Sequence, residues 1–264
     1  MSMPLTSIRL IGMVHLLPLP GAPGYGGSRE NIIERAISDA VHLEEAGFDA
    51  FLVENYGDVP FAKTDAGKHV TADMTAIVSA IRQETELPFG LQVLRNDVDS
   101  SLSIAAATGA AFIRVNIHTG AMHTDQGIIE GTAHDTLRHR RCIDAMHVHL
   151  LADVFVKHAA PLAPASIGES VRDTVERGLA DGIIISGSGT GEAADLAEVQ
   201  SAADATAAPV YVGSGVRLET LAESLALAHG VIVGTAIKTG RITAAPVDPD
   251  AARTFVQEAR SIIG

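Results

Sequence analysis

Short apolar runs of about five residues alternate with longer amphipathic stretches along almost the whole chain. A short apolar run bounded by glycine, proline or polar residues is typical of a buried strand, and a longer amphipathic stretch favours a helix. Eight runs fit the strand pattern. They are residues 9–15, 50–54, 89–94, 111–116, 149–156 and 182–186, and two runs within 208–238 that end at Gly213-Ser214-Gly215 and at Gly234 with Thr235.

Helices are predicted between these strands. The first is expected to begin after Ser28, whose hydroxyl suits an N-cap, and to run to Gly47. The other helices are predicted over residues 71–86, 98–108, 167–178, 193–203, 218–228 and 249–263, and a basic stretch covers residues 137–144. Between the fourth strand and residue 137, some twenty residues are expected to form a long loop, which is usually functional or mobile.

Eight strand–helix units in 264 residues place the chain in the α/β class and predict a single (β/α)8 TIM barrel over residues 1–264. A doubly wound open sheet is the main alternative. Its first strand should lead into a glycine-rich turn that opens a helix, whereas a proline-rich loop follows the first strand here. The barrel is therefore the preferred prediction.

Composition narrows the partners. The formal charge of −13 and the pI near 5.2 disfavour binding to nucleic acid or to an anionic membrane surface. A single cysteine, Cys142, forms no intrachain disulfide and suits a reducing compartment. No run of 18 apolar residues and no signal-peptide pattern is present, so we expect a soluble cytoplasmic protein. A homo-oligomer is expected only because barrels of this size commonly self-associate.

Ionisable and amide side chains cluster where the predicted strands end, which in a TIM barrel is the active-site face. Burying so many is costly, so they must pair or face a wet cavity. His15 is either a catalytic base or a hydrogen-bonded orienting group. Glu54 and Asp97 either supply acid and base chemistry or neutralise neighbouring arginines. The full set is His15, Glu54, Asn55, Asp58, Arg95, Asn96, Asp97, Arg114, Asn116, Asp153, Lys157 and His158.

Strand alternation places Asp153, Phe155 and Lys157 on one face of the fifth predicted strand. We expect this face to look into the barrel, because Ala152, Val154 and Val156 supply the apolar face that a covering helix needs. A desolvated lysine can act as a base or a Schiff-base nucleophile, whereas a lysine held charged by Asp153 suits an oxyanion or a phosphate. The sequence leaves both roles open.

Glycine-rich loops follow the last three predicted strands. Glycine lets backbone N–H groups approach an anion closely, and the final βα loops of a barrel frequently bind phosphate. The predicted phosphate ligands are Ser186, Gly187, Gly189, Thr190, Gly213, Ser214, Gly215, Gly234 and Thr235. No cofactor is firmly implied. A divalent metal such as Mg²⁺ is left open, because the carboxylates lack a local ligand spacing such as HxH or HExxH.

Several segments of the sequence resemble those of a known family. The resemblance rests on the segments GMVHLLPLPGAP, VENYGDVPF, LQVLRNDV, FIRVNIHTG, LLADVFVKHAAPL, SGSGTG, VYVGSGV and VIVGTAIK. These segments are similar to the BtpA family and occur in its order over nearly the whole chain. The resemblance implies a TIM barrel of the ribulose-phosphate-binding kind. The matching residues coincide with the strand-end set above, whereas residues 122–141 carry no motif that matches. The family takes its name from a member implicated in photosystem I biogenesis, and other members are described as sugar-metabolising or nucleoside-acting.

The sequence therefore predicts an enzyme acting on a phosphorylated pentose or ribosyl compound, as an isomerase, a lyase or a glycosyl-bond hydrolase. His15, Glu54, Asp97, Asp153 and Lys157 are the expected catalytic residues. Substrate binding is expected from Asn55, Asp58, Arg95, Asn96, Arg114, Asn116 and His158. Two alternatives stay open: a nucleosidase acting on unphosphorylated nucleosides, and a non-catalytic ligand-binding assembly or regulatory factor.

Overall fold

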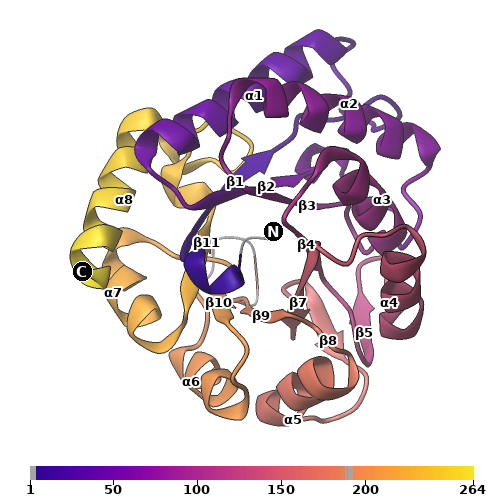
Figure 1. Cartoon of the computed structure of the whole chain (residues 1–264), viewed down its shortest axis with the longest axis vertical. Coiled ribbons are helices and arrows are strands. Elements are labelled where there is room, and N and C mark those ends of the chain that lie inside the picture. The colour runs from indigo at the N-terminus through magenta and orange to yellow at the C-terminus, as the bar shows by residue number, and fades with distance from the viewer. Residues whose placement is uncertain (1–3, 188, 190–192) are drawn as a thin grey trace.

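Eight parallel strands close into a barrel, with helices around its outside (Figure 1). A computed structural model describes residues 4–187, 189 and 193–264. Around the barrel the strands follow the order β1-β11-β10-β9-β7-β4-β3-β2, and each neighbouring pair is parallel. The predicted TIM barrel is confirmed. The barrel strands are β1 (Leu10–His15), β2 (Ala50–Glu54), β3 (Phe89–Gln92), β4 (Phe112–Val115), β7 (His149–Val154), β9 (Gly182–Ile185), β10 (Val210–Val212) and β11 (Gly230–Val233).

The predicted helices lie close to their expected ranges. Ser28 caps the first helix by accepting a hydrogen bond from the Asn31 amide at 3.1 Å, and Gly47 ends it with a left-handed backbone (φ 90°). Asp195 caps α6, which begins three residues later than predicted. The helices are α1 (Arg29–Ala46), α2 (Lys68–Glu84), α3 (Val98–Thr108), α4 (Ala133–Cys142), α5 (Ile167–Arg172), α6 (Leu196–Ala205), α7 (Leu218–Leu227) and α8 (Pro249–Ile263). Among the described residues, no helix is long and apolar enough to cross a membrane.

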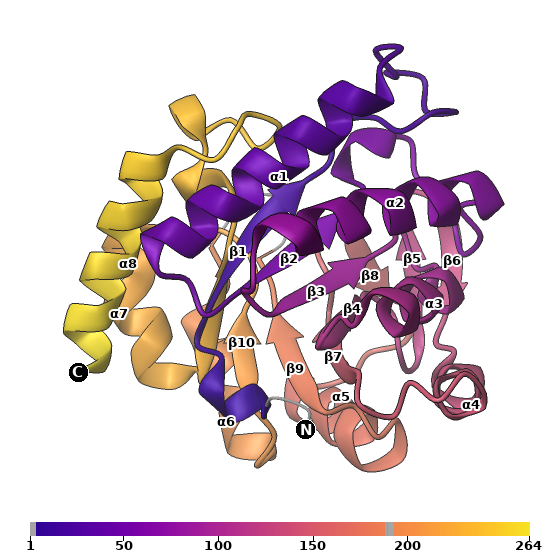
Figure 2. The same ribbon diagram turned by 45° about the horizontal axis from the view of Figure 1, so that its top comes forward.

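A small antiparallel sheet lies beside the barrel, where a long loop was expected. It contains β5 (Ala121–Thr124), β6 (Gly127–Glu130) and β8 (Ala159–Pro161), in the order β6-β5-β8. Figure 2 shows this sheet next to α3 and outside the barrel strands. Its strands have only three or four residues, which is too short for alternation to separate them from loop. The segment between β4 and α4 contains a hairpin, formed by the antiparallel strands β5 and β6.

Side chains of alternate strand residues fill the barrel in layers. One apolar layer contains Met13, Leu52, Phe112, Leu151, Ile184, Tyr211 and Ile232. At the amino-terminal end, the 3₁₀ helix η1 (Leu5–Ser7) adds Leu5 to this core, and the Tyr211 hydroxyl lies 3.0 Å from the Leu5 carbonyl oxygen. Two residues further along each strand, the same interior face carries His15, Glu54, Gln92, Arg114, Asp153, Ser186, Gly213 and Gly234. The closed end is apolar, and the open end is polar.

Candidate functional site

A cavity of about 250 Å³ opens at the carboxyl end of the barrel. Its wall brings together His15 of β1, Glu54 of β2, Arg114 of β4 and Lys157 from the segment after β7. The loops after β10 and β11 complete it. Arg217 and Arg241 also line it, so the cavity is rich in positive charge although the chain as a whole is acidic. A local field of this sign favours an anionic ligand.

His15 is a neutral imidazole with one nitrogen available. Burial lowers its pKa well below the usual 6.5, and the nearby charges of Lys238 and Lys157 lower that pKa further. Its Nδ1 lies 3.1 Å from the carbonyl oxygen of Thr243, which only accepts, so Nδ1 carries the proton. The lone pair of a neutral ring is then on Nε2. The geometry suits a general base, which is the first of the two roles expected from the sequence.

Glu54 is the only carboxylate among the described residues that line this cavity. Its side chain is buried, and it faces the positive charges of Lys157, Arg114 and Arg95. Burial, followed by the charge of Arg114, lowers the pKa of Lys157, while Glu54 and Asp153 act in the opposite direction. The cavity thus holds an acid, a neutral base and a lysine together.

Arg114 and Asp153 form a buried ion pair under the cavity. The Arg114 guanidinium donates from Nε and Nη2 to the two carboxylate oxygens, each at 2.8 Å. Asn116 Nδ2 donates to Asp153 at 2.9 Å, and the Ser186 hydroxyl donates to Asp153 at 3.0 Å. Four donors therefore occupy the carboxylate that was predicted to be catalytic. The structure gives Asp153 the role of holding Arg114 toward the cavity.

Lys157 reaches the cavity by a route that differs from the expected one. Strand β7 ends at Val154, and Phe155 has a left-handed backbone (φ 53°), so the predicted shared face of Asp153, Phe155 and Lys157 is interrupted. Asp153 nevertheless points inward, and Lys157 lines the cavity from the turn beyond the strand. The inward orientation is confirmed for both groups, although strand alternation accounts only for Asp153.

Backbone amides of the two last loops are available at the cavity wall. Gly215, Gly234, Thr235 and Ala236 all line it. The N–H groups of Gly234, Thr235 and Ala236 donate to no backbone acceptor on another described residue. The turn at Gly215 needs a positive φ (64°), and the N-terminus of α7 follows this loop. Unpaired amides of this kind bind anions such as phosphate.

The hydroxyl groups predicted to bind phosphate have partners within the protein. Ser186 donates to Asp153, and Ser214 lies 3.4 Å from the carbonyl oxygen of Gly189. The Thr235 hydroxyl is 2.9 Å from that of Thr243. The backbone amides at residues 234–236, in contrast, donate to no backbone acceptor on a described residue. Gly187 and Gly189 follow β9 as predicted, whereas Thr190 lies outside the described residues.

Several predicted site residues stabilise the loops instead of lining the cavity. Asp97 caps α3 through the Ser100 amide at 3.0 Å and also accepts from the Ala66 amide at 2.9 Å. Asn96 pairs with both backbone groups of Ile117. These contacts use the polar atoms that were expected to meet substrate. The sequence located the residues correctly at the strand ends, but their contacts belong to the scaffold.

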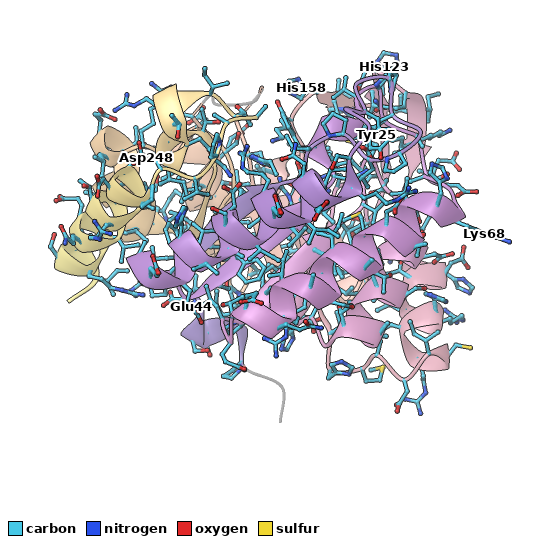
Figure 3. The ribbon with its side chains drawn as sticks, turned by 90° about the horizontal axis from the view of Figure 1, so that it is seen from above. Tyr25, Glu44, Lys68, His123, His158 and Asp248 are labelled. Carbon is cyan, nitrogen blue, oxygen red and sulfur yellow. The ribbon has the colours of Figure 1, made fainter. Side chains whose placement is uncertain are left out.

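Asn55, Asp58, Arg95 and His158 also lie away from the cavity wall. Asn55 donates to Asp58 at 2.9 Å and accepts from the Leu94 amide at 2.7 Å, while Asp58 accepts from the Leu19 amide at 2.8 Å. Arg95 donates to the carbonyl oxygen of Lys157. His158 is exposed, and Figure 3 shows it with His123 and Tyr25 at one end of the molecule, opposite Glu44.

Other residues of this region were not predicted from the sequence. Tyr56, Arg217, Arg241 and Thr243 line the cavity. Gln92 is 1% exposed and both its amide atoms lack a hydrogen-bond partner among the described residues. Gln92 lies beside Glu54 in the β2–β3 register. A polar residue within the apolar run 89–94 was the signal that the sequence offered.

No group of three or more histidine, cysteine, aspartate or glutamate side chains gathers to hold a metal in the part of the chain that the structure describes. Glu54 alone would contribute a carboxylate at the cavity, and Asp97 is already hydrogen bonded. Whether the protein binds a divalent metal such as Mg²⁺ is a matter for experiment.

Comparisons with known proteins agree with this architecture. The BtpA family model matches residues 6–261. The photosystem I biogenesis protein BtpA of Synechocystis sp. is 45% identical over 250 residues, covering 94% of this chain and 86% of that protein. Thiamine phosphate pyrophosphorylase from Pyrococcus furiosus has a TM-score of 0.63 at 14% identity and covers 98% of both chains.

A second solved structure is (S)-3-O-geranylgeranylglyceryl phosphate synthase from Thermoplasma acidophilum, in complex with sn-glycerol-1-phosphate. It has a TM-score of 0.60 at 16% identity and covers 97% of this chain and 96% of its own. At these identities the likeness to solved structures shows the shared barrel fold.

Proposed function

The chain belongs to the BtpA family, and we propose that it is an enzyme acting on a phosphorylated pentose or ribosyl compound. One observation carries the proposal. Unpaired amides of the last two barrel loops line the same cavity as a neutral His15 and a buried Glu54. An anion held at the amides therefore has acid and base groups within the same small space.

The proposed roles follow from the contacts. The amides of Gly234, Thr235 and Ala236 bind the phosphate, and Arg241 at the rim adds positive charge. His15 removes a proton through Nε2, and Glu54, its register partner on the neighbouring strand β2, moves a second proton. Lys157 and Arg114 stabilise negative charge that develops between them. The cavity volume of about 250 Å³ lies near the lower end of ligand pockets, which favours a pentose phosphate over a large cofactor.

A binding screen tests this proposal. Purified protein is heated with ribose 5-phosphate, inorganic phosphate, ribose, nucleosides and nucleoside monophosphates, each with EDTA and with Mg²⁺. A ligand at 100 times its dissociation constant stabilises the folded state by about 2.7 kcal/mol. We expect shifts only with phosphorylated compounds, followed by turnover of at least one of them in an NMR assay. Equal shifts with free nucleosides would indicate a nucleosidase, and no shift at all would favour the non-catalytic role.

A further inference from the structure

A second cavity, of about 300 Å³, lies between the small sheet and the segment from β8 to α5. Its walls differ chemically from those of the anion-binding cavity. Ile117, Met122 and Val156 form an apolar cluster on one side, and Leu162 at the wall is 53% exposed. None of its described lining residues is a lysine, arginine or histidine. The cavity therefore suits an apolar body and disfavours an anion.

Asn116 supplies an unpaired acceptor at this wall. Its Nδ2 donates to Asp153 at 2.9 Å, and a carboxylate only accepts, so the orientation of the amide is fixed. The opposite atom, Oδ1, has no hydrogen-bond partner among the described residues, although the residue is only 3% exposed. A buried acceptor without a donor is destabilising, so this wall of the cavity carries an unsatisfied polar atom.

A threonine pair adds acceptor capacity to the same cavity. The Thr174 hydroxyl donates to the Ser170 carbonyl oxygen at 2.7 Å, so the proton between Thr119 and Thr174, 2.8 Å apart, comes from Thr119. The Thr119 oxygen keeps its lone pairs for a ligand. Asp173, whose side chain is 65% exposed, adds a carboxylate to the wall. The polar groups of this cavity thus offer acceptors to a guest.

We propose that this cavity is a second small-molecule site, which binds an uncharged apolar group carrying N–H or O–H donors, such as a carboxamide on an aromatic ring. It adjoins the anion-binding cavity through Asp153, which lines the second cavity while its carboxylate holds Arg114 of the first. The two cavities select for opposite chemistry on either side of one ion pair.

Benzamide and benzoate test the proposal, because they share a shape but differ in charge and in N–H donors. Their binding is measured by ligand-observed NMR titration with and without saturating inorganic phosphate. Ser170→Phe blocks the second cavity from α5, and Ala163→Trp blocks it from the segment after β8. Ser261→Phe, at an exposed position of α8, is the matched control. Circular dichroism confirms that each variant folds.

We expect benzamide to bind wild-type protein at least tenfold more tightly than benzoate and to keep its affinity in phosphate and in Ser261→Phe. Either blocking variant that folds should weaken benzamide at least tenfold. Absence of benzamide binding at millimolar concentration, displacement of benzamide by phosphate, or full affinity in a folded blocking variant would overturn the proposal. The readout uses benzamide alone, so it holds whether or not a phosphorylated sugar is the substrate of the first cavity.

Discussion

At the scale of single residues, the same side-chain type takes different roles at neighbouring strand ends. Glu54 and Asp97 are both buried carboxylates, but Asp97 accepts from two backbone amides and the Ser100 hydroxyl. Glu54 makes no such contact with a described residue and lines the cavity. A carboxylate whose lone pairs are occupied holds its loop in place, whereas one that faces a cavity is able to exchange a proton.

Removing these two carboxylates should separate stability from activity. Glu54→Gln keeps the shape of the side chain and should lower kcat at least a hundredfold in a protein that still folds. Asp97→Ala removes an N-cap and should destabilise by about 1–2 kcal/mol, while the folded variant should keep the activity proposed for the wild-type protein. Urea denaturation and kcat on the phosphorylated substrate are the measurements. Full activity in Glu54→Gln would remove Glu54 from the proposed mechanism.

At the scale of elements, a buried ion pair connects the loop after β11 to helix α1. Lys238 lies 3.0 Å from Asp39 of α1 with both side chains fully buried, and Asp39 also accepts from the Val247 amide at 2.7 Å. Breaking such a pair from one side costs about 3–5 kcal/mol, because it leaves a buried charge without its partner. This ion pair holds Lys238, three residues after Thr235, against α1. It therefore helps to fix the position of the unpaired amides at residues 234–236.

Two glycines at the ends of β10 and β11 should respond differently to substitution by alanine. A Cβ at Gly234 would lie 3.0 Å from His15 Cε1, so Gly234→Ala should displace the imidazole and weaken phosphate binding at least tenfold. A Cβ at Gly213 would lie 2.3 Å from Ile184 Cγ2 inside the barrel, so Gly213→Ala should destabilise by about 1–3 kcal/mol.

Phosphate titration and thermal denaturation of both glycine variants distinguish the two effects. Unchanged phosphate affinity in a folded Gly234→Ala protein would place the anion elsewhere.

At the scale of the whole molecule, buried histidines tie stability to pH. Burial lowers the pKa of His15 and of His118, whose Nε2 lies 2.8 Å from the Gly178 carbonyl oxygen. Above the unfolded value near 6.5 both states are neutral, and their contribution to stability is fully present. As pH falls below 6.5 the unfolded chain takes up protons that the folded protein rejects, so stability is lost.

We therefore expect the unfolding free energy to fall between pH 7 and pH 5 by up to about 1.4 kcal/mol per pH unit for each of these histidines. His118→Gln retains a donor toward Gly178 and should flatten the dependence. Urea denaturation at half-unit pH steps measures this dependence, and a flat profile in the wild-type protein would contradict the expectation.

The predicted homo-oligomer is a separate question, which analytical ultracentrifugation addresses.

The fold followed from sequence to the extent that local patterns control it. Apolar runs, the Ser28 cap and the glycine stop at residue 47 are local signals, and the repeated strand–helix period made the barrel the preferred topology. The small sheet escaped prediction because β5 and β8 are stabilised by pairing with each other across 34 intervening residues, from 125 to 158, and not by their own composition.

The sequence by itself determined that polar groups gather at the carboxyl ends of the strands, since parallel strands place those ends at one rim. Only the tertiary structure decided which of them face the cavity. Asp97 and Asp153 are as polar as Glu54, yet each is occupied by donors from distant segments, at Ala66 and at Arg114. Hydrogen-bond partners separated by 31 and 39 positions leave no local signal in the sequence. Glu54 and the loop amides are available to a ligand because no described residue is positioned to hydrogen bond with them.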